Sequence, residues 1–546
     1  MNKKTIIIIP LLIAVSVAAG ILIGNLLKQN SQPAFNPMSY GNTNKLTTIL
    51  ELIDKGYVDS VNTNEIIEST IPDILNELDP HTAYIPAERM QEVREEMQGN
   101  FSGIGVQFSI QEDTVRVIEV ISGGPSSKVG ILPGDRIVRV NDSLIAGVDV
   151  ENNTVMELLR GEKSSKVTVG VIRKGADEEL EFEITRDDIP LFSVDVSYMI
   201  NPETGFIKVS RFAETTYDEF MNGMQTLNGA GAEKVIVDLR QNPGGSLQGV
   251  LKIVDEFLDK GEPILYTEGI NQPRKTYNAS GRNSFSDVEV YVLIDEFSAS
   301  ASEIFAGALQ DNDRGIVIGR RSFGKGLVQE QIPLMDGSAL RLTVARFYTP
   351  SGRCIQKSYE EGNEEYFNDL YARFSHREQL VADSINFNDS LKYTTSSGRT
   401  VYGGGGIMPD IFVPMDTTGN SEYYNKIYRK GLIYTFAYAY ADRNREALSR
   451  FSEASEFDNY LANQNILNEF VEYATEKGIQ KDAAGLKESE RVISTQLKAY
   501  IARNIIGEEG FYPIISQIDN TLLKAIEIAE KNLLVENLTQ PDTPVE

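Results

Sequence analysis

Two stretches of this 546-residue chain repeat one order of strand, turn and helix, and this order constrains the fold most strongly. Val235–Val237 is a short run of β-branched residues, typical of a strand buried on both faces. Asn242–Gly245 follows it as a turn before an amphipathic helix. A second unit begins at Val290–Ile294 and continues through a turn into a helix near Ser300–Asn312. Such units, joined by right-handed crossovers, predict an α/β core over residues 187–355.

The segments outside this core differ from it in pattern. Residues 99–186 alternate valine and isoleucine with polar residues between turn signals, which predicts a small β-rich module. A Gly-rich apolar stretch near residue 400 is expected to return to the core. The chain is therefore divided into 1–28, a signal or transmembrane anchor; 29–98, a linker and helical region; 99–186, the β-rich module; 187–355, the core; 356–399, a helical insertion; 400–414, a return to the core; and 415–546, a mostly helical C-terminal region.

The N-terminus carries the membrane signal. Lys3 and Lys4 precede the uncharged run Thr5–Leu27, which is long enough to span a bilayer. The positive flank predicts that the rest of the chain lies outside the cytoplasm. We expect the cell envelope, on the periplasmic side of the inner membrane. The segment is either a single anchor or a cleaved signal peptide with small residues at Val17–Ala19.

Composition excludes several classes of function. The net charge of −27 and the absence of a basic stripe argue against nucleic acid as a partner. A single cysteine, Cys354, and two distant histidines give no pattern for a structural zinc or a zinc hydrolase site. We therefore predict neither a metal nor a cofactor.

Ser300 stands where a core strand gives way to a helix. Unpaired N–H groups and the positive end of the helix dipole at this place suit a nucleophile whose oxyanion they would stabilise. An ordinary helix cap remains the alternative, because Ser300 and Glu303 have the spacing of a capping box.

Lys325 is flanked by Gly324 and Gly326, just after an apolar strand. A buried lysine loses its charge more readily and can then act as a general base. A solvated surface lysine and a phosphate-binding lysine are the alternatives, although the Walker pattern is absent. Since His81 and His376 both lie outside the α/β core, a serine–lysine dyad is the chemistry left for Ser300.

Two glycine motifs complete the set of candidate sites. Gly244 and Gly245, at the end of a core strand, would expose N–H groups to a substrate carbonyl. Gly103–Val106, at the opening of the β-rich module, would form a nest of N–H groups for a C-terminal carboxylate. A simple turn is the alternative at both places.

Taken together and in this order, the motifs resemble those of the carboxy-terminal processing, or tail-specific, peptidases. The resemblance covers roughly residues 43–355 and 400–414. The matching segments are Asp79–Tyr84, Gly103–Val106, Gly130–Asp135, Asp238–Gly245, Ser298–Glu303, Gln310–Asn312, Ser322–Gly326 with Gln329, and Tyr402–Ile407.

The resemblance implies a PDZ domain at residues 99–186 and a crotonase-like α/β serine protease core, with helical N- and C-terminal regions. It implies that Ser300 is the nucleophile, that Lys325 is the general base and that Gln329 orients the lysine. The amides of Gly245 and Ala301 would form the oxyanion hole, and Gly103, Ile104, Gly105 and Val106 would bind the end of the substrate. Glu303 and Asp311 would have supporting roles.

The expected function is that of an extracytoplasmic serine endopeptidase that recognises substrate C-termini and cleaves near them. The expected partners are proteins or peptides with a free C-terminus and the membrane, with a homo-oligomer or an adaptor as further alternatives. The competing hypotheses are a non-catalytic PDZ scaffold, a component of a regulated proteolytic switch, and a crotonase-like acyl-transfer enzyme.

Overall fold

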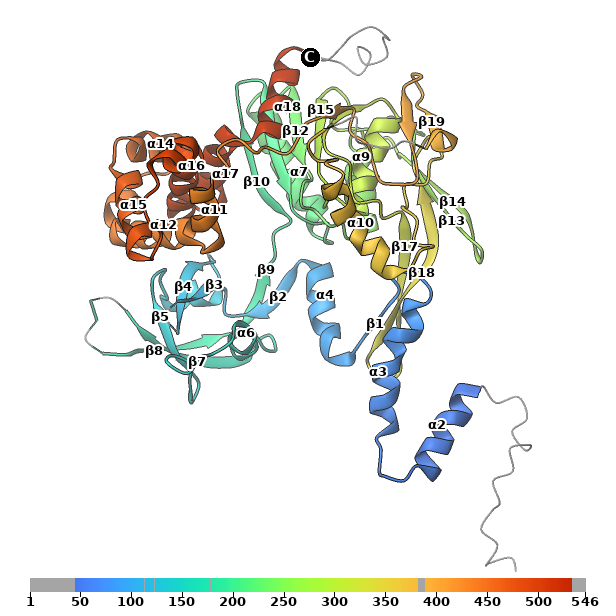
Figure 1. Cartoon of the computed structure of the whole chain (residues 1–546), viewed down its shortest axis with the longest axis horizontal. Coiled ribbons are helices and arrows are strands. Elements are labelled where there is room, and N and C mark those ends of the chain that lie inside the picture. Colours follow the sequence, from blue (N-terminus) through green and yellow to red (C-terminus); the bar gives the residue numbers. More distant parts are fainter. Residues whose placement is uncertain are drawn as a thin grey trace, which may run out of the picture. The chain divides into compact units, whose positions relative to one another are not determined.

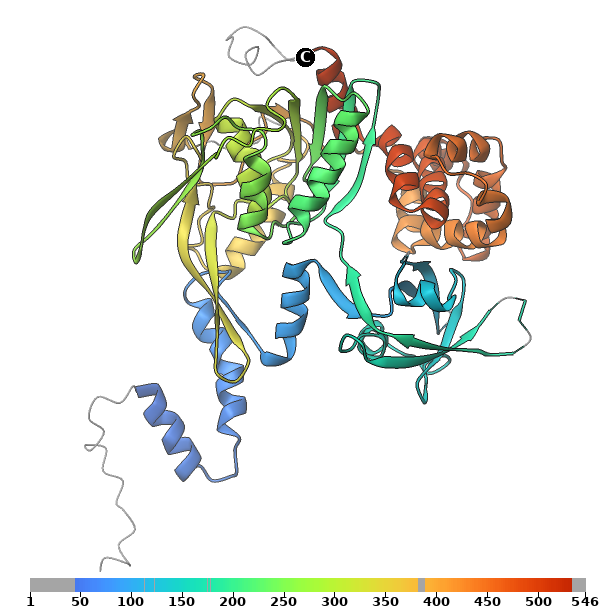
Figure 2. The same cartoon turned by 180° about the vertical axis from the view of Figure 1, so that it is seen from behind.

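The computed structural model describes residues 45–111, 113–121, 123–173, 175–176, 178–381 and 388–532 (Figures 1 and 2). The chain divides into two units, residues 1–74 and 75–546. None of the helices in the described ranges is both long enough and apolar enough to cross a membrane. The predicted N-terminal anchor, residues 1–28, falls outside these ranges.

The first unit contributes α2 (Lys45–Gly56) and most of α3 (Thr63–Asn76). No residue of α2 is buried, and Leu46 and Ile49 are exposed on it. These helices therefore make little hydrophobic core of their own.

The second unit is built around a six-stranded sheet in the order β10-β11-β12-β15-β16-β21. Its strands run parallel from β11 to β21, and β10 is antiparallel to β11. The bounds are Val194–Met199 for β10, Thr204–Val209 for β11, Lys234–Asp238 for β12, Glu289–Ile294 for β15, Gly315–Gly319 for β16 and Ile411–Phe412 for β21. The predicted strand–turn–helix order and the α/β fold class are confirmed.

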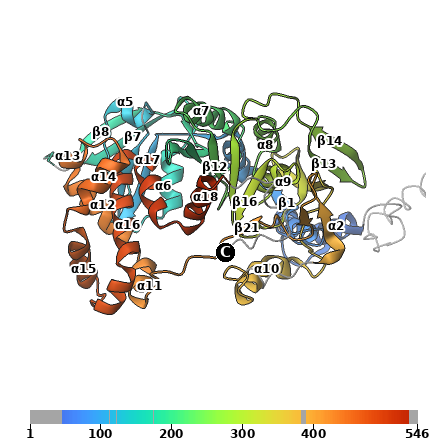
Figure 3. The same ribbon diagram turned by 90° about the horizontal axis from the view of Figure 1, so that it is seen from above.

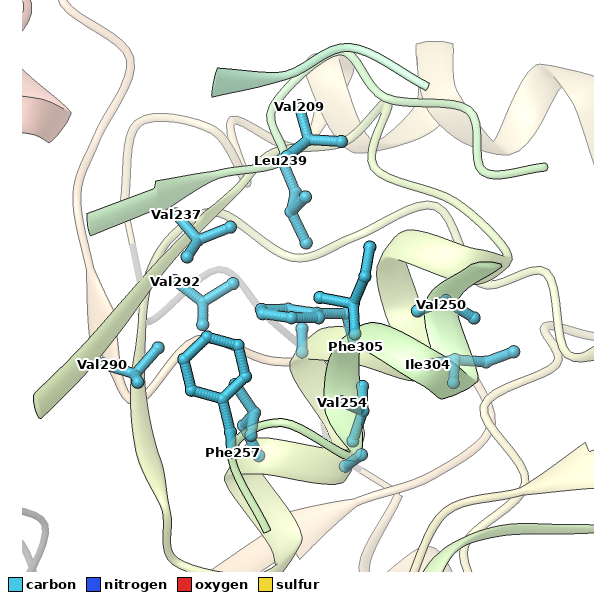
Figure 4. Packing of buried hydrophobic residues seen from close by; sticks show 14 of the residues in the cluster. Val209, Val237, Leu239, Val250, Val254, Phe257, Val290, Val292, Ile304 and Phe305 are labelled. Carbon is cyan, nitrogen blue, oxygen red and sulfur yellow. The ribbon is translucent and has the colours of Figure 1, made fainter. Parts of the chain in front are cut away.

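Alternation along the central strands explains why the sheet is covered on both faces. Val235 and Val237 pack with α7 (Thr216–Gly229), α8 (Leu247–Val254) and α9 (Ala301–Asp311). Figure 4 shows Val250 and Val254 of α8, and Ile304 and Phe305 of α9, beside the valines of the strands.

The opposite face of the sheet is covered by α18 (Asn520–Glu530). Ile236, between the two valines of β12, packs in a cluster with Leu522 and Ile528 of this helix. Seen from above, α9 and α18 lie on opposite sides of the strands (Figure 3). The last described helix thus belongs to the core, although the sequence places it in the C-terminal region.

A second, antiparallel sheet carries the loop of Lys325. Its strands are ordered β1-β18-β13-β14, and β17 pairs with β18. The bounds are Ala83–Ile85 for β1, Pro263–Gly269 for β13, Gln272–Asn278 for β14, Leu327–Pro333 for β17 and Ala339–Tyr348 for β18. Lys325 precedes β17, and Gln329 lies within it.

The β-rich module has its own sheet and its own hydrophobic core. Its strands are β3 (Val106–Gln111), β4 (Thr114–Val120), β5 (Arg136–Val140), β6 (Ser143–Leu144), β7 (Lys166–Ile172) and β8 (Leu180–Thr185), with helices α5 (Pro125–Val129) and α6 (Asn152–Leu159). Val155 and Leu159 of α6 pack with Val115, Val117 and Val169. The short strands β2 (Asn100–Gly103) and β9 (Asp187–Pro190) pair with each other where the chain enters and leaves the module.

The insertion between residues 356 and 399 holds α10 (Asn363–Ser375), the 3₁₀ turn Asp389–Leu391 and β19 (Lys392–Thr394). β19 pairs with β20 (Thr400–Tyr402), and the chain then passes through Gly403–Gly406 to β21 at the edge of the core sheet. On the N-terminal side, the 3₁₀ turn Ala87–Arg89 and α4 (Met90–Gln98) join β1 to the β-rich module.

The C-terminal region forms a helical bundle with a separate hydrophobic cluster before the chain reaches α18. Its helices are α11 (Glu422–Arg429), α12 (Leu432–Arg443), α13 (Arg445–Leu448), α14 (Ala454–Ala462), α15 (Ile466–Glu476), α16 (Ala483–Ile506), α17 (Glu508–Ile515) and the 3₁₀ turn Ser516–Ile518.

Candidate active site

Ser300 sits on a sharp turn between β15 and α9. Its φ of 54° and ψ of −110° lie outside the regions that ordinary residues occupy, so its surroundings must hold it there. The buried Ser298 fixes this turn: its hydroxyl accepts from the Asp295 amide at 2.9 Å and donates to the Leu239 carbonyl at 2.8 Å. A strained residue that is firmly held at a strand-to-helix turn is typical of a functional site.

The turn after β12 comes up against Ser300, and only glycine fits there. A Cβ on Gly244 would lie 2.7 Å from the Ser300 Cβ, and a Cβ on Gly245 would lie 2.0 Å from the Phe212 carbonyl oxygen. Both glycines also have positive φ, at 98° and 138°. The close approach of the two turns therefore depends on the glycine pair.

Two backbone N–H groups at this place are available to a ligand. The Gly245 amide has no hydrogen-bond acceptor within the part of the chain that the structure describes, whereas the Gly244 amide donates to Asn242 Oδ1 at 2.9 Å. Ala301 is the first residue of α9, so its N–H has no partner in the helix. These are the two amides that, by the family resemblance, are expected to form an oxyanion hole.

Lys325 is half-buried in the loop that leads into β17. Its Nζ donates to Gln329 Oε1 at 3.1 Å, and Gln329 Nε2 in turn donates to the carbonyl of His81. Burial, and then the positive charge of Arg341, lower the pKa of Lys325; Asp79 and Glu303 oppose this shift. A lowered pKa makes the neutral amine, which is the form a general base requires, easier to reach.

Glu303 links the serine and the lysine through one carboxylate. Its Oε2 accepts from the Ser300 amide at 2.8 Å and from the Lys325 amide at 2.9 Å. Its Oε1 accepts from the Gly324 amide at 2.7 Å and from the Ser322 hydroxyl at 2.5 Å. The Glu303 side chain therefore joins the lysine loop to the start of α9 by hydrogen bonds.

The Glu303 carboxyl is fully buried, and burial raises its pKa while the four hydrogen bonds oppose the shift. The Ser322 hydroxyl accepts from the Ile407 amide at 2.6 Å, so its own hydrogen is free for Glu303. All four partners thus donate, which is the arrangement of an ionised carboxylate. The capping box predicted as the alternative for Ser300 is present, and in it Glu303 accepts from the Ser300 amide.

The glycine-rich loop after β20 packs on the other side of the lysine loop. A Cβ on Gly406 would lie 2.6 Å from the Ser322 carbonyl oxygen, and a Cβ on Gly324 would lie 3.1 Å from the Gly406 nitrogen. The return of the chain to the core at this point therefore helps to hold Lys325.

A cavity of about 1050 Å³ brings Ser300, Lys325, Gln329, Gly245 and Ala301 together in its lining. No hydrogen bond between the Ser300 and Lys325 side chains occurs in the described residues. Part of the wall is apolar and comes from Phe212, Leu247, Ile304, Leu327 and Phe347. The cavity therefore offers apolar surface beside the candidate nucleophile.

The four predicted residues of the β-rich module lie elsewhere. Gly103 ends β2, Val106 begins β3, and neither Ile104 nor Gly105 lines the cavity. The carbonyls of Ile104 and Gly105 accept from the amides of Ser126 and Ile121, and the Gly105 φ of 75° reverses the chain before β3.

Two contributors to the site were not predicted from the sequence. The turn at His81 provides the carbonyl that binds Gln329, and Arg341 faces Lys325 from β18. The Asp79–Thr82 turn is visible in the sequence as a motif, but nothing there connects it to β17. No signal in the sequence marks Arg341.

Three family models match the chain. The model of peptidase family S41 matches residues 203–363, which contain strands β11, β12, β15 and β16 of the core sheet and the candidate dyad. A PDZ domain model matches residues 102–184, which form the β-rich module. A model described as a family of unknown function (DUF8443) matches residues 423–507 in the C-terminal bundle.

Curated relatives agree with these matches. The chain is 36% identical over 313 residues to the carboxy-terminal-processing protease of Bartonella bacilliformis, covering 56% of this chain and 71% of the relative. It is 33% identical over 316 residues to the carboxy-terminal processing protease CtpB of Bacillus subtilis, covering 57% and 65%. It is 31% identical over 322 residues to a probable CtpA-like serine protease of Staphylococcus aureus, covering 59% and 64%. The fold, the family models and these relatives together show that the chain belongs to the carboxy-terminal processing serine proteases of peptidase family S41.

Proposed function

We propose that this protein is an extracytoplasmic endopeptidase that cleaves proteins near their C-termini with a Ser300–Lys325 dyad. The observation that carries the proposal is the shared carboxylate of Glu303. One oxygen of this carboxylate accepts from the amides of both dyad residues, so the serine and lysine segments are fixed to each other at one cavity.

The proposed chemistry follows from the groups around Ser300. Neutral Lys325 takes the proton of the Ser300 hydroxyl as the oxygen attacks the scissile carbonyl. The Gly245 and Ala301 amides receive the charge that develops on the carbonyl oxygen. Lys325 then gives its proton to the leaving amine. The same lysine takes a proton from water as the water attacks the acyl group, and it returns this proton to the Ser300 oxygen when the ester bond breaks.

The lowered pKa of Lys325 supports its role as a base. An ammonium group cannot accept a proton, and burial together with Arg341 favours its neutral form. The side chains of Ser300 and Lys325 are not hydrogen-bonded here, which is common for catalytic groups without substrate. A change of lysine rotamer on substrate binding would bring the two groups together.

The PDZ domain is proposed to choose the substrate. The loop Ile104–Gly105 precedes β3, so a peptide that added a strand along β3 would place its terminal carboxylate at this loop. The apolar wall of the cavity, which includes Leu247 and Phe347, then suits an apolar side chain next to the scissile bond.

This selection can be tested with one unstructured peptide made in two forms, with a free C-terminal carboxylate and with a C-terminal amide. The full-length protein should cleave the free acid faster. Its Ser300→Ala variant should bind the acid more tightly than the amide in a titration. Equal cleavage and equal binding of the two peptides would contradict recognition of the carboxylate.

Location outside the cytoplasm is part of the proposal and rests on the sequence. Lys3 and Lys4, followed by Thr5–Leu27, support export with the protease on the far side of the membrane. Protease treatment of intact spheroplasts should degrade the C-terminal region. Protection of that region until the membrane is lysed would contradict this topology.

Activity itself is tested by incubating the full-length wild type and Ser300→Ala with an unfolded protein. Mass spectrometry should find new fragments that end near the substrate C-terminus with the wild type alone. A scaffold without catalysis would give identical fragment patterns for both proteins.

A further inference from the structure

The Gln329 side chain is held by a chain of hydrogen bonds that leads away from the core. Gln329 Oε1 accepts from Lys325 Nζ at 3.1 Å, and Gln329 Nε2 donates to the His81 carbonyl. The imidazole of His81 continues the chain, because its Nε2 lies 2.8 Å from the hydroxyl of Tyr366 on α10. Three segments that are far apart in sequence thus meet behind the lysine.

We propose that His81 and Tyr366 are positioning residues for Lys325, acting through the amide of Gln329. This inference rests on the proposed dyad. It adds that helix α10 and the Asp79–Thr82 turn help to orient the lysine of that dyad.

The orientation of Gln329 matters because a neutral lysine amine has one lone pair. With Gln329 Oε1 toward Lys325, one N–H of the amine is occupied and the lone pair remains for the Ser300 proton. A flipped amide would present its NH₂ group and compete for that lone pair. The His81 carbonyl can only accept, so it holds the NH₂ group on its own side.

The His81 carbonyl is itself fixed to the strands that carry Gln329. Asp79 Oδ1 accepts from the amides of His81 and Thr82 at 2.8 and 2.9 Å, and from the Thr343 hydroxyl at 3.2 Å. Thr343 on β18 lies opposite Gln329 on β17 in the register of the sheet. The turn is therefore anchored at the position that faces Gln329.

Tyr366 fixes the other side of His81. Tyr366 is only 2% exposed, and its ring meets the imidazole edge-on with centroids 5.3 Å apart. Burial raises the pKa of Tyr366, and burial and Lys325 lower the pKa of His81 to about 4. At neutral pH the tyrosine keeps its hydrogen and the imidazole is neutral, so a Tyr366 donor and a His81 acceptor match.

Arg373 of α10 and Gln356, which precedes this helix, contact the loop on the two sides of Lys325. Arg373 is buried and donates to the carbonyl of Ser322 at 2.8 Å. Gln356 donates to the Tyr366 hydroxyl at 3.4 Å, and its Oε1 accepts from the Gly326 amide at 2.8 Å. Residues of the inserted segment thus contact the lysine loop at Ser322 and at Gly326. Through His81 and Gln329, Tyr366 is also linked to Lys325 itself.

The test is the rate at which a fluorophosphonate labels Ser300 in the full-length protein, because this rate needs the dyad and no bound peptide. Tyr366→Phe removes one hydroxyl and keeps the ring. We expect labelling to slow about fivefold to tenfold, which corresponds to one hydrogen bond. Tyr371→Phe is the matched control, since Tyr371 lies on the same helix and is 73% exposed. It should label like the wild type.

A double-mutant cycle separates positioning from general support of the fold. In a Gln329→Ala background, Tyr366→Phe should have no further effect, because the amide that it orients is gone. His81→Ala should slow labelling in the wild type and not in Gln329→Ala. If Tyr366→Phe slows labelling equally in both backgrounds, or labels like Tyr371→Phe, the inference is overturned.

Lys325→Ala distinguishes this inference from the proposed function. If Lys325→Ala is not labelled while Tyr366→Phe is labelled like the wild type, the dyad is supported and the positioning role of Tyr366 is excluded. Full labelling of Lys325→Ala would remove the dyad and, with it, the role of His81 and Tyr366.

Discussion

At the scale of single residues, Glu303 does more than cap a helix. Its buried carboxylate accepts from four donors, the arrangement of an ionised carboxylate, and two of these donors are the amides of Ser300 and Lys325. A charge in such a place is tolerated only because every donor is matched to it. The spacing of Ser300 and Glu303 in the sequence therefore fits a helix cap and also fits the proposed role of Glu303 in joining the two dyad segments.

Glu303→Gln tests this arrangement. Glutamine keeps the size of the side chain but turns an NH₂ group against N–H and O–H donors. We expect a loss of about 2–4 kcal/mol in the free energy of unfolding and at least about tenfold slower cleavage. Urea unfolding and peptide cleavage measure the two effects. The exposed Glu330→Gln on β17 is the control, and a Glu303→Gln protein equal to it in both assays would contradict the role.

Arg341→Gln tests the cause of the lowered lysine pKa. Arg341 disfavours a second positive charge on Lys325, so its removal should raise the lysine pKa. Because the base works in its neutral form, labelling of Ser300 should rise with pH along a curve displaced to higher pH. The exposed Arg136→Gln on β5 should leave the curve in place. An unmoved curve in Arg341→Gln would mean that the charge of Arg341 does not contribute to the lowered pKa of Lys325.

His81 gives a prediction about stability. Its pKa is about 4 in the folded chain, against 6.5 for a free histidine. As pH falls from about 6.5 to about 4, the unfolded chain takes up a proton that the folded chain refuses, so stability present above 6.5 is lost. His81→Gln should lose less stability than the wild type over this range, measured by urea unfolding. The exposed His376→Gln should follow the wild type, and matching losses in all three proteins would contradict the shift.

At the scale of elements, the turn after β12 is held by Asp519, at the start of α18. Arg240, in the loop that leads to Gly245, donates to both oxygens of Asp519 at 2.8 and 2.6 Å and also pairs with Asp238. Asp519 caps the start of α18 through the Leu522 amide. The helix that covers the sheet therefore also holds the loop that carries Gly245, the glycine of the proposed oxyanion hole.

Asp519→Asn should loosen this loop. The change removes one charge from the pair with Arg240 and is expected to cost about 1–3 kcal/mol of stability. We expect kcat for peptide cleavage to fall with little change in KM, since Gly245 serves the transition state more than the bound substrate. Glu530→Gln, an exposed change on the same helix, is the control. A kcat that falls no further in Asp519→Asn than in the control would contradict the link.

The sequence predicts those elements whose signals are local. The apolar runs before Asp238 and Asp295, the turn glycines and the amphipathic helices follow each other directly, so the α/β core can be read from them. The contact of Gln329 with His81 joins positions 248 residues apart, and it depends on how β1 pairs with β18. The spacing of apolar residues along the sequence carries no information about such a contact. The packing of α18 against the sheet also cannot be predicted from the sequence. The apolar face of α18 has the same pattern as that of a helix in the C-terminal bundle.

At the scale of the whole molecule, the PDZ domain and the proposed active site are built on separate hydrophobic cores. One cluster contains Val115 and Val169 of the PDZ domain, another contains Val237 and Phe305 of the core that carries Ser300, and a third contains Phe436 and Phe470 of the C-terminal bundle. Each cluster has its own buried residues. A change in the dyad should therefore leave the fold of the PDZ domain intact, which makes single substitutions at the active site interpretable.

The central claim is that Ser300 is activated by Lys325. The most direct measurement is cleavage of an unfolded protein by the full-length wild type, Ser300→Ala, Lys325→Ala and Lys325→Arg, with folding checked by urea unfolding. Arginine keeps the charge and much of the length of lysine but cannot give up its proton. The account predicts that all three variants fold and that none cleaves. Cleavage that survives in Lys325→Arg or Lys325→Ala would contradict it.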